Sequence, residues 1–186
     1  FSNDGMKLFT SDKTTDILFR FDLTSPYDVS TCSFVYETTT VDTAPLQNGS
    51  NGGNRNTGNN IADNRLQGFE INEDGTKLFT SYNMKPQLDG TNDTFQYIHE
   101  YNLSKPYDIS TRTYAGNDER CELGSGSDGH TGNQAHDLEF SNDGMKLFTS
   151  DKTTDILFRF DLTSPYDVST CSFVYETTTV DTAPLQ

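Results

Sequence analysis

Residues 1–23, FSNDGMKLFTSDKTTDILFRFDL, decide the fold of this chain. Their second half places Ile17, Phe19, Phe21 and Leu23 on one side and a leucine and two charged residues on the other. This alternation with a period of two predicts a half-buried β-strand. The Asp-Gly pair at residues 4–5 predicts a tight hairpin turn. No stretch holds a helical period, so we expect an all-β fold with almost no helix.

The first 47 residues return letter for letter as residues 140–186. Phe1 and Phe140 begin the two copies, so the period is 139 residues. Each period contains two similar units, because Asp-Gly-x-Lys-Leu-Phe-Thr-Ser occurs at residues 4–11, 74–81 and 143–150. Such self-similarity identifies a repeat array. We expect the sequence to be a window onto a longer periodic chain.

Turn signals divide each unit into strands. A Pro-Tyr-Asp-(Val/Ile)-Ser-Thr motif follows each alternating segment and punctuates it, because proline disfavours a central strand. The last unit therefore predicts four strands, at residues 136–141, 146–150, 156–162 and 171–176. The expected units are residues 1–47 with a truncated first strand, 65–117 with an insertion at 82–94, and 135–186. Polar segments 48–64 and 118–134 are expected to be solvent-exposed loops.

The Asp-Gly-x-Lys-Leu-Phe-Thr-Ser motif, followed by Ile-Leu-Phe-Arg-Phe-Asp-Leu, resembles the blades of β-propellers, of the WD-like, lactonase-like and surface-layer families. The resemblance implies four-stranded blades. The units lie near 70 residues apart, whereas common blades span roughly 40–50 residues. A blade cannot bury its faces alone, so neighbouring blades are required. The predicted inter-blade packing residues are Phe9, Phe19, Phe21, Tyr97, Tyr101, Phe158 and Phe160.

An arginine and a glutamate at equivalent positions could pair between neighbouring blades, or both could remain solvated. Arg20 and Arg159 align with Glu100 of the middle unit. If the two kinds of unit alternate, opposite charges would face each other and help to set the register between blades. A surface pair of this kind contributes at most about 1 kcal/mol.

Net charge excludes some partners. The chain carries 28 acidic and 13 basic residues, which gives a formal net charge of −15. Such a surface repels phosphate backbones and anionic lipid, so we expect no nucleic-acid partner. No apolar run approaches the roughly 20 residues that span a bilayer, so we expect no membrane insertion. The expected partners are copies of the protein itself or further repeats of a longer chain.

The three cysteines leave several pairings open. Cys32 and Cys171 occupy the same position of the repeat, whereas Cys121 belongs to the middle unit. Cys121 could form a disulfide with Cys32 or with Cys171, or all three could be half-buried thiols.

Oxygen ligands are frequent in the segment after the middle unit. Asp118, Glu119 and Asp128 are weak candidates for binding calcium, which prefers oxygen ligands. No EF-hand spacing or Gly-Gly-x-Gly-x-Asp spacing is present. We therefore expect no cofactor, with calcium as the one possible ion.

Two histidines offer a second weak metal site. His130 and His136 lie six residues apart with Asp137 nearby, but zinc requires three or four convergent ligands. The pair His136-Asp137 opens a first strand, where the lactonase-like propellers that these blades resemble place metal ligands or acid–base residues. The middle unit has Gln67-Gly68 at this place. We find no nucleophile motif and predict no catalytic residue.

The patterns favour a structural function. Exact repetition, an acidic surface and long Asn/Gly-rich loops indicate a structural or adhesive repeat protein of an extracellular fibre, surface layer or appendage. Such a protein would be surface-exposed or extracellular, would assemble by blade-to-blade packing and would not be an enzyme. The alternative is a closed β-propeller that binds a ligand or protein through its long rim loops. A lactonase-like enzyme is a third reading, and it rests on His136-Asp137 alone.

Overall fold

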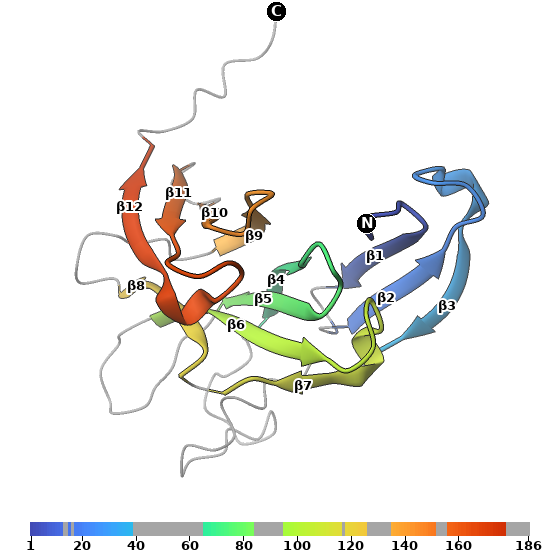
Figure 1. The fold of residues 1–186 in the computed structure, drawn as a ribbon, viewed down its shortest axis with the longest axis horizontal. Coiled ribbons are helices and arrows are strands. Elements are labelled where there is room, and N and C mark those ends of the chain that lie inside the picture. Colours follow the sequence, from blue (N-terminus) through green and yellow to red (C-terminus); the bar gives the residue numbers. More distant parts are fainter. Residues whose placement is uncertain are drawn as a thin grey trace, which may run out of the picture.

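The protein folds into propeller-like β-blades arranged as an arc (Figure 1). The computed structural model describes residues 1–12, 15, 17–38, 65–83, 95–116, 118–125, 135–151 and 156–177. Within these ranges the chain forms three separate antiparallel sheets, joined in sequence order. Helical structure in the described residues is limited to three-residue 3-10 turns, which confirms the all-β expectation.

Blade 1 contains β1 (Lys7–Asp12), β2 (Ile17–Asp22) and β3 (Ser33–Glu37), in that order across its sheet. Blade 3 contains β9 (Ala135–Phe140), β10 (Lys146–Asp151), β11 (Ile156–Asp161) and β12 (Ser172–Glu176), again in sequence order. β1 and β9 lie toward the inside of the arc, and β3 and β12 lie toward its outside (Figure 1).

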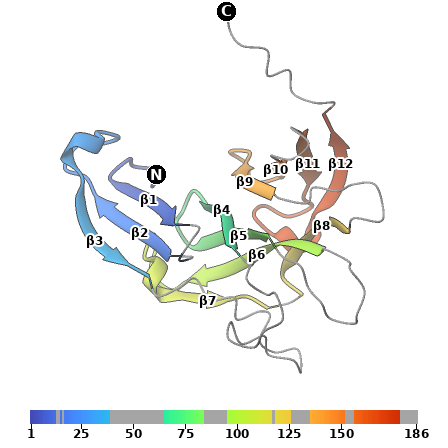
Figure 2. The ribbon, with the colours of Figure 1, turned by 180° about the vertical axis from the view of Figure 1, so that it is seen from behind.

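Blade 2 has a divided outer strand. It contains β4 (Arg65–Ile71), β5 (Lys77–Asn83), β6 (Phe95–Leu103), β7 (Arg112–Tyr114) and β8 (Arg120–Ser125). β7 and β8 both pair with β6, through Tyr101↔Tyr114 and Ile98↔Cys121, so together they occupy one edge of the sheet. The view from behind shows the same order of strands (Figure 2).

The prediction of a loop at residues 118–134 was wrong in part, because residues 120–125 form β8. Cys121 and Leu123 are buried while Glu122 between them is exposed, which is the alternation of a strand. The Gly/Ser-rich residues that follow obscured this short pattern. The expected loop 48–64 lies outside the described residues. Of the expected insertion at 82–94, residues 84–94 also lie outside them.

The Asp-Gly turn and the Pro-Tyr-Asp turn are hydrogen-bonded to each other in every blade. The glycine of each Asp-Gly turn has a positive φ, 75° at Gly75, and its carbonyl oxygen accepts a hydrogen bond from the backbone N–H of Tyr107, 2.8 Å away. Tyr107 itself has φ 58°, in the left-handed region. The same contact joins Gly5 to Tyr27 at 2.9 Å, and Gly144 to Tyr166 at 2.9 Å. The hairpin turn and the Pro-Tyr-Asp turn therefore form one structural unit.

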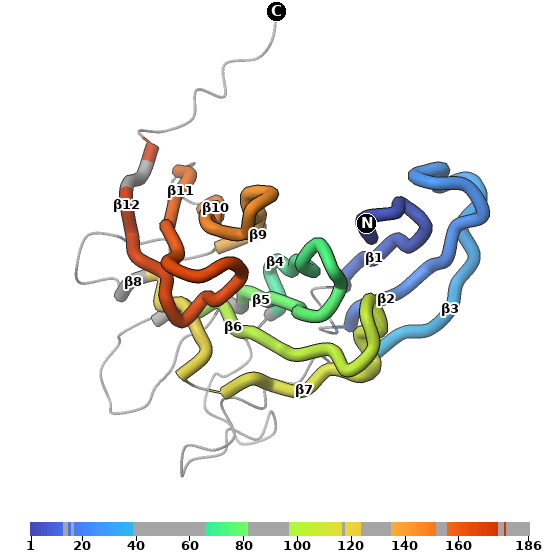
Figure 3. Tube along the Cα trace, in the orientation of Figure 1, coloured from blue at the N-terminus to red at the C-terminus, as the bar shows by residue number. Residues whose placement is uncertain are grey.

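A capped 3-10 turn follows each of these tyrosines: η1 (Val29–Thr31), η3 (Ile109–Thr111) and η4 (Val168–Thr170). In η1 the Asp28 side chain accepts a hydrogen bond from the Ser30 backbone N–H, 3.0 Å away, and Asp108 and Asp167 do the same in the other blades. Side-chain oxygens of this kind satisfy N–H groups that a helix start leaves unpaired. The trace in Figure 3 shows the turns at corresponding places in the three blades.

Each blade has two faces, which we name by their neighbours. The forward face packs against the next blade and carries Phe9 and Leu18 in blade 1. The rear face packs against the preceding blade and carries Leu78 and Tyr101 in blade 2. These four residues belong to one buried cluster, the blade 1–2 interface.

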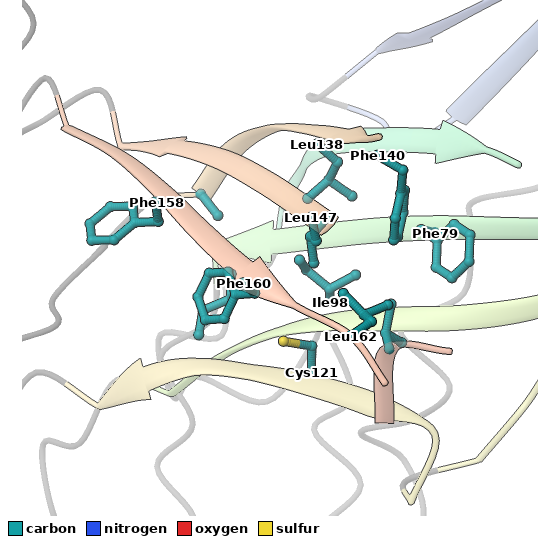
Figure 4. Packing of buried hydrophobic residues seen from close by; sticks show 12 residues of the cluster. Phe79, Ile98, Cys121, Leu138, Phe140, Leu147, Phe158, Phe160 and Leu162 are labelled. Atoms are coloured by element: carbon teal, nitrogen blue, oxygen red, sulfur yellow. The ribbon is translucent and has the colours of Figure 1, made fainter. Parts of the chain in front are cut away.

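The blade 2–3 interface repeats this arrangement. The forward face of blade 2, with Phe79 and Ile98, packs against the rear face of blade 3, with Leu147 and Phe160 (Figure 4). Phe79 and Phe140 meet with their ring centroids 4.6 Å apart. The core of the protein therefore lies between blades rather than within them, as repeat architectures require.

The predicted packing residues fall into two groups. Phe9, Tyr101, Phe158 and Phe160 are buried in these interfaces. The remaining three are half-buried: Phe19, Phe21 and Tyr97. Phe19 and Phe21 lie on the rear face of blade 1, where the described residues contain no preceding blade.

Pairing of Arg20 or Arg159 with Glu100 between blades is not what the structure shows. Arg20 binds Asp22, two residues along its own strand, and Arg159 binds Asp161 in the same way. Glu100 instead pairs with Lys77 of the neighbouring strand, with Nζ and Oε1 2.7 Å apart. Alignment identified equivalent positions, but the side chains found closer partners in their own sheet.

Candidate functional site

Acidic side chains gather where the inner strands of blades 2 and 3 meet. Gly68 of β4 lies so close to β9 that a Cβ atom there would be 2.9 Å from the Cα atom of Asp137. The Ser81 hydroxyl, on β5, donates a hydrogen bond to the Ala135 carbonyl oxygen over 3.2 Å. A glycine at this position therefore permits β4 and β9 to approach closely.

Glu70 is the perturbed member of this group. Burial, together with the smaller effect of the negative charges of Glu139 and Asp137, raises its pKa to about 8. Glu70 is half-buried on β4, whereas Asp137 and Glu139 are exposed on β9. At neutral pH the cluster thus combines a carboxylic acid with nearby carboxylates, a combination that acid–base catalysis uses.

Sequence reasoning singled out Asp137 but missed Glu70 and Glu139. A signal was present, because both glutamates lie four residues before the Asp-Gly turn of their unit. Aligned carboxylates on the first strands of adjacent blades predict an acidic pair at their junction, provided that these strands line the inside of the arc.

The predicted metal ligands do not come together in the described part of the chain. Asp118 is exposed and Glu119 is half-buried, in the turn between β7 and β8. His136 is half-buried, and the Asp137 carboxylate accepts a hydrogen bond from the adjacent Leu138 N–H, 3.0 Å away. No group of three or more His, Cys, Asp or Glu side chains among these residues could hold a metal ion. Asp128 and His130 lie outside the described residues.

A disulfide and a side-chain hydrogen bond join blades 2 and 3. Cys121 of β8 forms a disulfide with Cys171, the C-terminal cap of η4, with the two Cα atoms 5.7 Å apart. The Lys77 ammonium, already paired with Glu100, donates to the Tyr166 carbonyl oxygen over 2.9 Å. Cys32, the repeat equivalent of Cys171, is a free and exposed thiol.

His99 lies on the rear face of blade 2, facing blade 1. Burial lowers its pKa to about 4, and the positive charge of Arg120 contributes in the same direction. Its ring packs against that of Tyr114, with centroids 5.9 Å apart. His99 is therefore neutral at physiological pH and packs against aromatic rings of its own blade, in a buried place where a charged ring would be costly.

Among the residues that the structure describes, no helix is both long and apolar enough to cross a membrane.

No known protein family and no curated protein matches this sequence. Solved structures resemble its fold, among them the periplasmic gluconolactonase of Pseudomonas aeruginosa, with TM-score 0.53 and 10% identity. A 6-phosphogluconolactonase candidate from Bacteroides fragilis has TM-score 0.51 and 12% identity. Each comparison covers 96% of this chain but only 38% of the other, so the chain spans well under half of those proteins.

Similarity at this level of identity establishes the fold alone: the blades are those of a β-propeller. Both of these neighbours are named for lactonase activity, so the expectation that the chain is not an enzyme receives no support.

Proposed function

We propose that this chain is a structural or adhesive repeat protein of an extracellular fibre, surface layer or appendage. In this role its blades assemble by packing forward face against rear face. The observation that carries the proposal is the middle blade, which buries apolar residues of both its faces against neighbours that are identical in sequence. A blade that packs through both of its faces can continue an array wherever another blade is available.

The link between Cys121 and Cys171 supports an extracellular location, because structural disulfides persist mainly in oxidising compartments. The net charge of −15 suits a hydrated surface protein and disfavours nucleic acid as a partner. Partners of this protein would therefore be further blades of the same kind.

Electron microscopy of the purified native particle tests this proposal. Filaments with a regular axial repeat are expected. Discs with a central hole would favour the alternative, a closed propeller that binds a ligand or protein partner at its rim. Isolated particles of single-chain size would contradict the assembly role.

A second candidate function is hydrolysis of a sugar lactone. The observation in its favour is Glu70, a carboxyl group with a pKa near 8 beside Asp137 and Glu139. Such a group can act as a general acid near neutral pH. Activity on a sugar lactone that disappears in Glu70→Gln but persists in Glu122→Gln, an exposed control on β8, would support it.

A further inference from the structure

Blades 1 and 3 provide an internal comparison, because the same sequence occurs in two different surroundings. Val168 is fully buried at 0% exposure, whereas its equivalent Val29 is 56% exposed. Phe160 is 2% exposed and packs against blade 2, whereas Phe21 is only half-buried. The rear face of blade 3 is thus covered by blade 2, and the identical rear face of blade 1 is open.

The exposed residues of blade 1 form an apolar patch on this open rear face. Its most exposed members are Tyr27, Val29 and Phe34, at 59%, 56% and 58%. Phe173, the equivalent of Phe34, packs against the blade 2–3 core. Side chains that are buried in one copy and exposed in the other identify the surface that a missing neighbour would cover.

Cys32 is a second, independent observation. Its equivalent Cys171 forms a disulfide with Cys121 of the preceding blade, whereas Cys32 is free and exposed. The local backbones agree, since the Cys32 and Cys171 N–H groups donate to the Val29 and Val168 carbonyl oxygens, each over 3.3 Å. Cys32 is therefore presented in the conformation that pairs in blade 3.

Only the middle type of blade has a cysteine at the position that could pair with Cys32. In blade 2 Cys121 lies opposite Ile98 on β6. In blade 3 the residue opposite the equivalent Leu157 is Thr177, whose N–H donates to the Leu157 carbonyl oxygen over 2.9 Å. Blade 1 has Thr38 at the same place, bonded to Leu18 over 2.8 Å. A blade of the type of blades 1 and 3 therefore has a threonine at the position of Cys121 and could not form a disulfide with Cys32.

We infer that the rear face of blade 1 receives a further blade of the middle type, from the same polypeptide, which forms a disulfide with Cys32. This inference rests on the proposed assembly role and specifies its order: middle-type blades alternate with blades of the type of blades 1 and 3. The forward face of blade 3 agrees with this order. Its Leu157 is 45% exposed, whereas the equivalent Leu18 is fully buried against the middle blade.

The link requires an oxidant. Two thiols become one disulfide by exchange with a small-molecule disulfide such as oxidised glutathione, which takes up two electrons and two protons and leaves as two thiols. The reaction is the same one that would form the bond between Cys121 and Cys171.

The test compares the chain of residues 1–186 with a chain in which residues 48–139 are repeated ahead of Phe1. This addition keeps the repeat in register, because Phe140 follows Glu139 in the sequence and begins an identical segment. Both proteins are treated with oxidised glutathione, alkylated under native conditions and digested without reduction. In the shorter chain Cys32 should be alkylated. In the longer chain it should be linked to the Cys121 of the added segment.

Two substitutions in the longer chain are matched controls. Val29→Asp places a charge on the surface that the added blade would cover, and should restore alkylation of Cys32. Val35→Asp should leave the link intact, because Val35 and its equivalent Val174 are exposed in both blades, at 42% and 44%. Amide hydrogen exchange in β2 should slow in the longer chain, even where oxidation is incomplete.

Cys32 that remains fully alkylated, with unchanged exchange in β2, would overturn the inference, provided that the bond between Cys121 and Cys171 forms in the same sample. A link between two separate molecules, seen as a dimer on a non-reducing gel, would also overturn it. These outcomes are distinct from failure of the assembly role, because the link can form in a particle that closes into a disc instead of extending into a filament.

Discussion

The Tyr107 ring lies directly over Gly75, and a Cβ atom on that glycine would clash with Cδ2 of the tyrosine. The same pair shares a backbone hydrogen bond, so one contact holds the hairpin turn against the Pro-Tyr-Asp turn. The contact recurs in all three blades, between Gly5 and Tyr27 and between Gly144 and Tyr166. It explains why both motifs occur in every unit of the sequence.

Gly75→Ala should therefore destabilise the protein by about 1–3 kcal/mol, because the added methyl group meets a ring and the backbone has a positive φ. The matched control is the same substitution in a Tyr107→Ala background, where the positive φ remains but the ring that the methyl group meets is absent. Chemical denaturation should give the larger loss for Gly75→Ala when Tyr107 is present. Equal losses would mean that the contact with Tyr107 contributes nothing.

Phe158 and Phe19 are the same residue of the repeat in different surroundings. Phe158→Ala should cost about 3–5 kcal/mol, because a ring that is 4% exposed leaves a cavity between blades 2 and 3. Phe19→Ala should cost less than half as much, since this ring is half-buried on an open face. Denaturation midpoints of the two variants measure the difference. Similar costs would contradict the account of packing between blades.

Glu70 should give stability an unusual dependence on pH. Its folded pKa of about 8 lies above the ordinary value of 4.5, so the folded state holds a proton that the unfolded state releases. The stabilisation that Glu70 gives the folded state is fully present below pH 4.5 and is lost as the pH rises toward 8. Glu70→Gln should match the natural protein near pH 4 and melt on the order of 5 °C higher at pH 9.

Two controls separate this effect from others. His99, with its folded pKa lowered to about 4, loses stabilisation as the pH falls below 6.5, but it is present in both proteins and cancels in their difference. Glu139→Gln removes a neighbouring negative charge and should lower the folded-state pKa of Glu70, so that the stabilisation is lost at a lower pH. A difference in melting temperature that is constant from pH 4 to pH 9 would refute the raised pKa.

The disulfide between Cys121 and Cys171 should stabilise the fold, because it limits the freedom of the unfolded chain. Cys121 and Cys171 are 50 residues apart, so Cys171→Ser should lower the free energy of unfolding by about 2–4 kcal/mol. Cys32→Ser should change it by less than about 0.5 kcal/mol, because this thiol is exposed and unpaired. Calorimetry without reductant compares the two variants. Comparable losses would show that the bond does not constrain the chain.

Local patterns predicted most of the strands. The alternation at residues 17–23 and the Asp-Gly turns correspond to hairpins in the structure, and the four strands expected in the last unit are all present. β8 escaped prediction because a six-residue strand at the edge of Gly/Ser-rich sequence has too few alternations to stand out. The Glu70 cluster escaped because its members come from two blades, and their meeting depends on how closely β4 and β9 approach.

The sequence by itself determined the repeat, the all-β class, the turn chemistry and the alternating faces, because these depend on neighbours within a few residues. Only the tertiary structure decided which of those faces is covered. Val29 and Val168 have the same sequence around them but differ in exposure from 56% to 0%. Burial, the choice of disulfide partner and the pKa of Glu70 depend on the blade alongside, and no local pattern contains that neighbour.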